Sequence, residues 1–92
     1  MDYRRGIYQG EVTDGLPDGF GMLLLPQSEM IQIGHFKQGV VTGNFTELYV
    51  KTGATDSVNY KDGKRHGQLT ITQANGSVSK RHYKNGKFER FD

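Results

Sequence analysis

Glycine recurs along this chain at a nearly constant interval, and that spacing limits the available folds more than any other feature. The segments "VTDG", "FKQG", "YKDG" and "YKNG" end at Gly15, Gly39, Gly63 and Gly86, at intervals of 24, 24 and 23 residues. A second glycine follows four residues after each of the first three, at Gly19, Gly43 and Gly67. Recurrence at a fixed interval of this length is the signature of a repeat architecture.

Each repeat unit has the pattern of a β-hairpin. A short run of strand-forming residues leads into each turn, at 7–12, 31–36, 55–60 and 78–83, and a second run follows at 20–25, 44–50 and 68–73. Asp-Gly and Asn-Gly are strong hairpin signals, because both central residues of a type I′ turn need a positive φ. No segment shows an extended helical period.

The sequence therefore predicts an all-β fold in which consecutive β-hairpins form one elongated antiparallel sheet. We expect a single domain over 1–92 with about 3.5 units of 23–24 residues. The units cover roughly 7–30, 31–54, 55–77 and 78–92. Side chains alternate between the two faces of a strand, so Gln32, Gly34 and Phe36 share one face. The 24-residue period predicts a stacked ladder of core residues, formed by Val12, Phe36, Tyr60 and Tyr83.

Composition narrows the class of protein. The 92 residues include no cysteine, which excludes disulfides, thiolate metal sites and a cysteine nucleophile. The start of the chain lacks the apolar core of a signal peptide, and the longest apolar run, 22–25, is too short to span a membrane. We expect a soluble intracellular protein, either cytoplasmic or at the periphery of a membrane or the cytoskeleton.

Catalytic signatures are missing from the sequence. His35, His66 and His82 lack the close spacing of a zinc site, and no serine lies in a G-x-S-x-G setting. No P-loop is present, and "GFGMLL" lacks the third glycine of a dinucleotide-binding motif. Asp14, Asp62 and Asn85 precede turn glycines and are explained as turn formers. The sequence predicts a protein that is not an enzyme and that needs no metal or cofactor.

The repeat resembles the MORN (membrane occupation and recognition nexus) family, whose units run Tyr-x-Gly-acid-aromatic-x-x-Gly-x-x-x-Gly-x-Gly. The segment "YQGEVTDGLPDGFG" matches at Tyr8, Gly10, Glu11, Gly15, Gly19 and Gly21, with Val12 in place of the aromatic residue. The second unit has Gln32 in place of tyrosine and Phe45 in place of the last glycine. The resemblance covers residues 7–89 and implies a hairpin sheet that acts as a binding scaffold.

The second half also resembles the MORN-variant repeats of bacterial antitoxin-type proteins. The similarity lies in the bulky residue after Gly67, the Asn75-Gly76 turn and the "YKNG" segment. It implies an alternative function, in which the chain is an immunity protein that neutralises a toxin.

A single sheet with an apolar face needs a covering partner, so we expect another protein to dock a helix or strand there. The outward apolar positions that stacking does not require are the predicted contacts: Leu23, Leu25, Phe45, Tyr49, Leu69 and Ile71. The open edges of such a sheet also invite pairing with a second copy, so a homodimer remains an alternative.

Charge is distributed unevenly. Residues 1–50 contain three Lys or Arg against six Asp or Glu, whereas residues 51–92 contain nine against four. If the turns stack, they form a basic rim of Lys61, Lys64, Arg65, Lys84 and Lys87. This rim predicts an alternative function, binding to an anionic membrane surface or to an acidic partner. Nucleic acid is a poor candidate, since the net charge is only +2.

Overall fold

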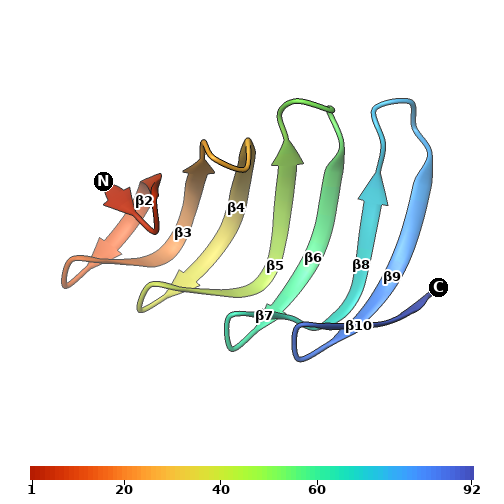
Figure 1. Cartoon of the computed structure of the whole chain (residues 1–92). Helices are drawn as coiled ribbons and strands as arrows, with labels where there is room; N and C mark the ends of the chain where they lie inside the picture. The colour runs from red at the N-terminus through yellow and green to blue at the C-terminus, as the bar shows by residue number, and fades with distance from the viewer.

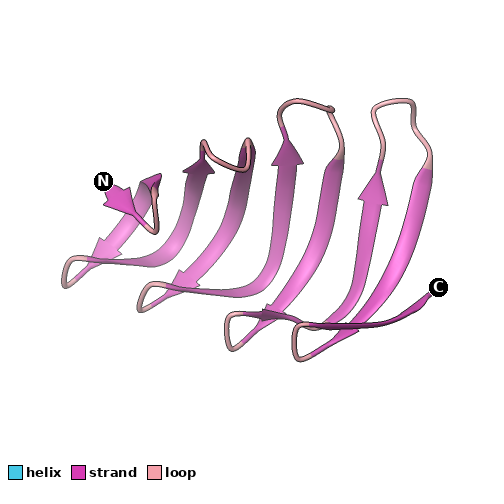
Figure 2. Cartoon of the chain, viewed as in Figure 1, coloured by secondary structure: helices cyan, strands magenta, loops and turns pink.

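The structure is a computed structural model that describes all of residues 1–92, and it contains ten strands and no helix (Figures 1 and 2). The strands are β1 (Asp2–Tyr3), β2 (Gly6–Thr13), β3 (Leu16–Leu25), β4 (Met30–Lys37), β5 (Val40–Tyr49), β6 (Thr55–Lys61), β7 (Lys64–Arg65), β8 (Gly67–Thr72), β9 (Val78–Lys84) and β10 (Lys87–Phe91).

All ten strands belong to one antiparallel sheet that does not close. Its order is β1-β2-β3-β4-β5-β6-β8-β9-β10, and the short β7 pairs with β6. Each strand therefore lies beside its neighbour in sequence, as a row of hairpins requires (Figure 1). The predicted fold class, a single sheet of consecutive hairpins, is confirmed.

Tight two-residue turns connect β2 to β3, β4 to β5, β6 to β7 and β9 to β10, and all four lie at the same end of the strands. At Asp62-Gly63 the φ angles are 52° and 78°, and at Asn85-Gly86 they are 50° and 86°, as a type I′ turn requires. Because the turn ends at the first glycine, β3 already begins at Leu16. The predicted start at residue 20 is wrong, since the second glycine, Gly19, lies within the strand.

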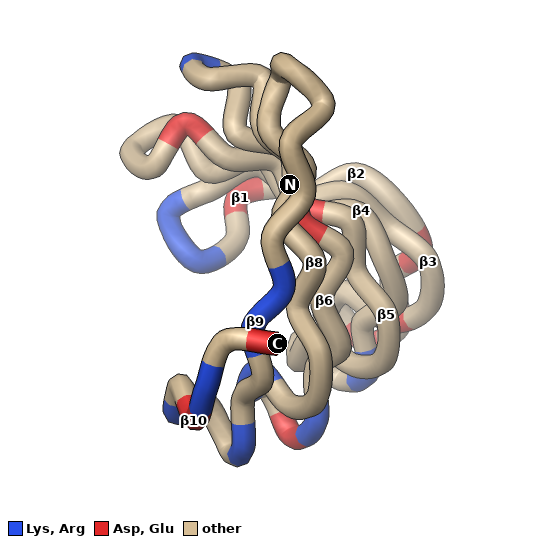
Figure 3. Tube along the Cα trace, turned by 90° about the vertical axis from the view of Figure 1, so that its right-hand side faces the viewer, with Lys and Arg blue, Asp and Glu red and all other residues tan.

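Each unit has an irregularity close to its second glycine or, in the fourth unit, close to Arg90, which takes that position. The register shifts between Gly10 and Val12, between Gly34 and His35 and between Phe88 and Arg90, and in the third unit β7 and β8 are separate strands. Bulges of this kind bend a strand and increase its twist. The repeated bend curves the sheet, which in the end view of Figure 3 bows around a concave side.

The core lies on the concave face. Its buried side chains are Tyr8, Leu23, Phe36, Val41, Phe45, Val58, Tyr60 and Leu69. Four aromatic rings form a ladder along it, with edge-to-face contacts from Tyr8 to Phe36, Phe36 to Phe45 and Phe45 to Tyr60 at centroid distances of 5.1, 5.3 and 5.4 Å. Such pairs stabilise a core by about 1 kcal/mol each beyond the area they bury.

The predicted ladder is wrong at Val12, which is 49% exposed. Val12 is exposed because only β3 flanks it: β1 pairs with Gly6 and Ile7 alone and does not reach this part of β2. The ladder instead begins at Tyr8. Tyr83 continues the core only as a partly buried neighbour. The ladder also includes Phe45, from the second strand of its unit, between Phe36 and Tyr60.

Candidate functional site

Polar side chains interrupt the core midway along the concave face. One row of directly opposed residues crosses the sheet as Tyr8, Leu23, Gln32, Glu47, Asp56 and Ile71. Glu47 is 0% exposed and Asp56 only 4%. Buried carboxylates are costly unless they are hydrogen-bonded or paired, so their contacts decide what this region can do.

Glu47 is satisfied by three side chains. Gln32 Nε2 and Tyr60 Oη each donate a hydrogen bond to Glu47 Oε2 at 2.7 Å, and Arg65 Nη2 lies 3.3 Å from Oε1. Burial, with the charge of Glu47 added, raises the pKa of the Tyr60 phenol far above its usual range. Burial works to lower the pKa of Arg65, but its contacts with Tyr60 and Glu47 outweigh this and raise it. This cluster is a closed network that stabilises the fold.

Asp56 is less well satisfied. Tyr49 Oη donates to Asp56 Oδ2 at 3.0 Å, but the buried Oδ1 has no partner. Burial raises the pKa of the Asp56 carboxyl, and the hydrogen bond from Tyr49 only partly opposes this. Nε of Arg81 is also buried without a partner. An acceptor and a donor are therefore both unused in one region, where Arg81 contributes a favourable charge to Asp56.

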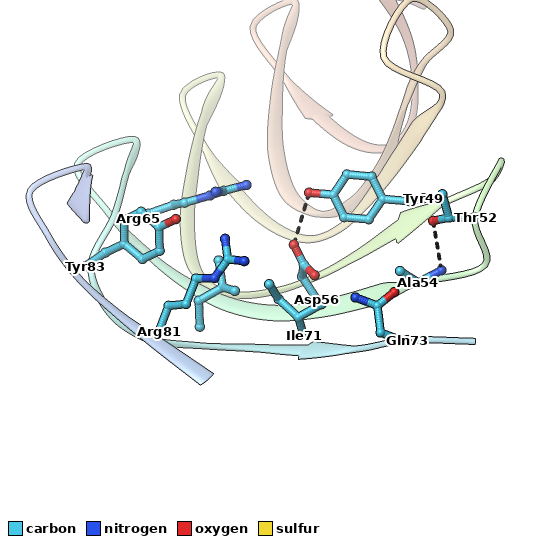
Figure 4. Close-up of a pocket in the computed structure, with 10 residues that line it drawn as sticks. Tyr49, Thr52, Ala54, Asp56, Arg65, Ile71, Gln73, Arg81 and Tyr83 are labelled. Carbon is cyan, nitrogen blue, oxygen red and sulfur yellow. Dashed lines mark hydrogen bonds between the residues drawn. The ribbon is translucent and has the colours of Figure 1, made fainter. Parts of the chain in front are cut away.

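These groups line a shallow depression on the concave side (Figure 4). Its volume is about 320 Å³, and its walls mix apolar and polar side chains. Figure 4 shows Tyr49, Asp56 and Arg81 pointing into the space enclosed by the curved strands. The lining residues are Tyr49, Thr52, Ala54, Asp56, Arg65, Leu69, Ile71, Gln73, Arg81 and Tyr83. A hollow with apolar walls and a few polar groups has the features of a binding site.

The predicted sheet-face contacts all lie on this concave side, but not in the way expected. Leu23 and Phe45 are 2% exposed and Leu69 is 1% exposed, so their predicted outward position is wrong. They are buried because the sheet curves around them and they form its core. Leu25 and Ile71 are partly buried and pack against that core. Ile71 also lines the depression, together with Tyr49.

The two turns that carry the basic residues, at Asp62-Gly63 and Asn85-Gly86, lie side by side at the same end of the strands. The amide of Gly86 donates to the carbonyl of Arg65 at 2.8 Å, and the side chain of Lys64 covers Gly86, where an added Cβ would lie 3.5 Å from it. Lys61 opposes Lys64 in one hairpin, and the next hairpin brings Lys84 opposite Lys87. Arg65 was predicted to belong to this rim, but it is directed to the buried Glu47, so this part of the prediction is wrong.

Sequence reasoning missed Gln32, Glu47 and Asp56 as members of the site. Their alternation carried the signal: Glu47 is in phase with Phe45 and Tyr49, and Asp56 is in phase with Val58. A carboxylate in phase with core aromatics must be buried with partners. The convex face was also missed, where Ile7, Leu24, Ile31 and Leu48 oppose one another in a row.

No three His, Asp or Glu side chains lie close enough together to hold a metal ion. No helix of the structure is long and apolar enough to cross a membrane.

The fold defines a repeat protein, built from β-hairpins in a single curved sheet with a depression on its concave face. The sequence profile of the MORN repeat matches residues 8–28 and 59–78, so these two segments are MORN repeats. MORN repeats occur in scaffolds that interact with proteins and membranes, and the family is typically non-catalytic. No curated protein matches this chain. Gln32, Glu47, Tyr49 and Asp56 all lie between the two matched segments.

Proposed function

We propose that this chain is a non-catalytic scaffold that holds a segment of another protein against its concave face. The depression, with its mixed apolar and polar lining, is the observation that carries the proposal. Asp56 Oδ1 and Arg81 Nε are buried without partners, so they lie out of reach of a docking segment. A peptide segment instead packs its apolar atoms on Ile71 and Tyr83 and meets the accessible polar groups of the rim.

The aromatic ladder does not make these contacts in the proposal, because it is already buried. The partner instead meets the rim of the depression, where Gln73 is exposed and Arg81 is half-buried. Substituting these two residues removes the contacts without changing the aromatic ladder. Arg81 also supplies a favourable charge to Asp56 and lies over the ring of Phe91, so circular dichroism must show that the variant is folded. A substitution such as Phe45→Asp is a poor test, since it places a charge inside the core.

The experiment is an affinity purification from native lysate with four immobilised baits, followed by quantitative mass spectrometry. The baits are the original chain, the depression variant Gln73→Ala/Arg81→Ala, the opposite-face control Thr46→Ala/Ser57→Ala and the rim variant Lys84→Glu/Lys87→Glu. We expect one protein in stoichiometric amount on every bait except the depression variant. Equal recovery on the depression variant would overturn the proposal.

A second function is favoured by the side-by-side basic turns. Lys61, Lys64, Lys84 and Lys87 form a rim suited to an anionic membrane, where each charge near the surface contributes about 1 kcal/mol. Sedimentation with phosphatidylserine-containing vesicles tests it, with phosphatidylcholine vesicles as the control. Binding that salt weakens and that Lys84→Glu/Lys87→Glu abolishes would support this function. The antitoxin-type function stays a prediction from sequence resemblance, which a one-to-one complex with a toxin would support.

A further inference from the structure

Strand β10 lies at the end of the sheet and pairs with β9 on one side only. Figure 3 views the molecule from this end, with β10 in front and its charged residues of both signs in view. Two aromatic side chains on β10 are largely exposed: Phe88 at 47% and Phe91 at 70%. Exposed edges with apolar side chains favour pairing with another strand.

The hairpin geometry shows which backbone groups β10 offers at its outer edge. A two-residue turn at Asn85-Gly86 makes Lys84 and Lys87 a hydrogen-bonded pair, so the next pair, Tyr83 and Phe88, points its amide groups away from the hairpin. At the other end, the amide of Asp92 donates inward to Lys80 at 3.0 Å. The preceding residue, Phe91, therefore also points its N–H and C=O outward.

The bulge in β10 decides which side chains share a face. Phe88 lies opposite Tyr83 and Phe91 lies opposite Arg81, both on the concave side, and their rings are 4.9 Å apart. Arg90 lies opposite His82 on the convex side, and Glu89 reaches the same histidine at 3.7 Å. The bulge thus places the two phenylalanines on one face and the central charged pair on the other.

The segment "KFERFD" at 87–92 is complementary to itself when it is reversed. We propose that two copies of this chain pair through β10, antiparallel, about a two-fold axis perpendicular to the sheet. In this register Glu89 lies opposite Arg90 of the second copy, Phe88 opposite Phe91, and Lys87 opposite Asp92. A two-fold axis of this direction keeps the concave faces on the same side, so every opposed pair shares a face.

The outward backbone groups fit the same register. Phe88 of one copy exchanges hydrogen bonds with Phe91 of the other, and the axis repeats this exchange, so the two bulges face each other. The ion pairs within one chain, Arg90 to Glu89 at 3.8 Å and Arg90 to Asp92 at 3.3 Å, do not prevent this. They involve exposed groups, and exposed ion pairs contribute little, so they can exchange for contacts across the axis.

Asp92 is the least free member of the segment, since it also accepts a hydrogen bond from Gln68 at 3.2 Å. The central pair, Glu89 with Arg90, is therefore the sharper test. Because of the two-fold axis, a single charge reversal creates two like-charge pairs per dimer. The double reversal restores two opposite-charge pairs.

The experiment is sedimentation velocity over a concentration series of the chain 1–92. We expect a monomer–dimer equilibrium for the original sequence, and a dissociation constant about tenfold or more higher for Glu89→Arg and for Arg90→Glu. The double variant Glu89→Arg/Arg90→Glu should recover the dimer. A mixture of the two single variants should form a heterodimer, since each supplies the charges that the other lacks.

The mixture separates a loss of pairing from a loss of folding, because a misfolded variant would not associate with its counterpart. Lys51→Glu, in an exposed turn away from β10, is the charge-reversal control and should leave the dimer unchanged. A chain that stays monomeric at its highest soluble concentration would overturn the proposal. So would a dimer that neither single reversal weakens.

Discussion

Glu47 is fully buried although the sheet has only one layer, because three side chains from other strands surround it. Gln32 comes from β4, Tyr60 from β6 and Arg65 from β7, so the carboxylate joins four strands. Removing one partner of a buried ion pair leaves the other charge uncompensated, which costs more than the pair contributes. A substitution at Glu47 should therefore lower the stability of the fold more than a substitution at an exposed residue.

We expect Glu47→Ala to lower the free energy of unfolding by about 2–4 kcal/mol, because it opens a cavity and leaves Arg65 unpaired. Urea unfolding followed by circular dichroism measures the change. Thr46→Ala, at the exposed neighbour of Glu47 on the same strand, is the control and should change stability by less than about 0.5 kcal/mol. Equal effects for the two variants would show that the buried network contributes nothing.

Asp56 should reduce stability at neutral pH, since burial raises the pKa of its carboxyl above the unfolded value. At a pH above the folded-state pKa, the Asp56 carboxyl is ionised and its burial lowers the stability of the fold. As the pH falls below this pKa, the carboxyl is protonated in the folded state and the cost of burying its charge disappears. Asp56→Asn is therefore expected to be more stable than the original at pH 7, and the difference should shrink as pH falls toward the ordinary range of aspartate.

Unfolding curves of both chains at several pH values test this dependence. The relevant difference is between the two chains at each pH, because other groups titrate equally in both. A difference that grows on acidification would contradict the assignment. An unchanged difference would mean that the Asp56 carboxyl is not the titrating group.

Among the elements, β3 and β4 depend on glycines that face the aromatic ladder. An added Cβ would lie 2.2 Å from Oη of Tyr8 at Gly21, and 2.7 Å from the ring of Phe45 at Gly34. These two glycines are directly opposed in the sheet, so the rings pack on bare backbone. The repeat retains glycine here for space, whereas the turn glycines are needed for their φ angle.

Gly34→Ala should destabilise the chain by about 1–3 kcal/mol, the usual cost of overpacking a core. A smaller partner should relieve the clash, so Gly34→Ala/Phe45→Leu should cost less than the sum of its two single substitutions. Chemical denaturation of the four chains completes this double-mutant cycle. Strict additivity would indicate that the methyl group does not meet the ring.

At the scale of the whole molecule, every strand pairs only with strands next to it in sequence or one short strand away. Sheets assembled in this way behave as nearly one-dimensional arrays, in which stability is a sum of unit and interface contributions. The aromatic ladder runs through the middle of the array, while Tyr83 and β10 lie at its end. Strands β9 and β10 should therefore unfold locally while the strands in the middle of the sheet stay folded.

Hydrogen exchange distinguishes these regions. Tyr83→Ala is expected to lower protection in β9 and β10 and to leave β3 to β5 nearly unchanged. Phe45→Ala removes a ring that touches both Phe36 and Tyr60, so it should lower protection from β3 through β8. A uniform loss of protection in both variants would show that the sheet unfolds as one cooperative unit.

Local chemistry made the fold predictable from the sequence. The turn at Asp62-Gly63 needs only its own two residues to adopt positive φ angles, and alternation along one strand places Gln32 and Phe36 on the same face. The concave site was less predictable, because alternation separates two faces but does not say which one is buried. Leu23 and Phe45 were expected to face a partner, and the structure places them in the core.

The repeat, the hairpins, the single antiparallel sheet and the side-by-side basic turns could all be predicted from the amino-acid sequence. Each of these depends on residues close together in the chain and on a constant interval. The burial of Gln32 and Glu47, with Ile31 and Ile33 on the more open convex side, could be seen only in the three-dimensional structure. The reason is curvature: the bulges bend the strands toward one face, and whatever lies on that face is enclosed by the curved strands on either side of it.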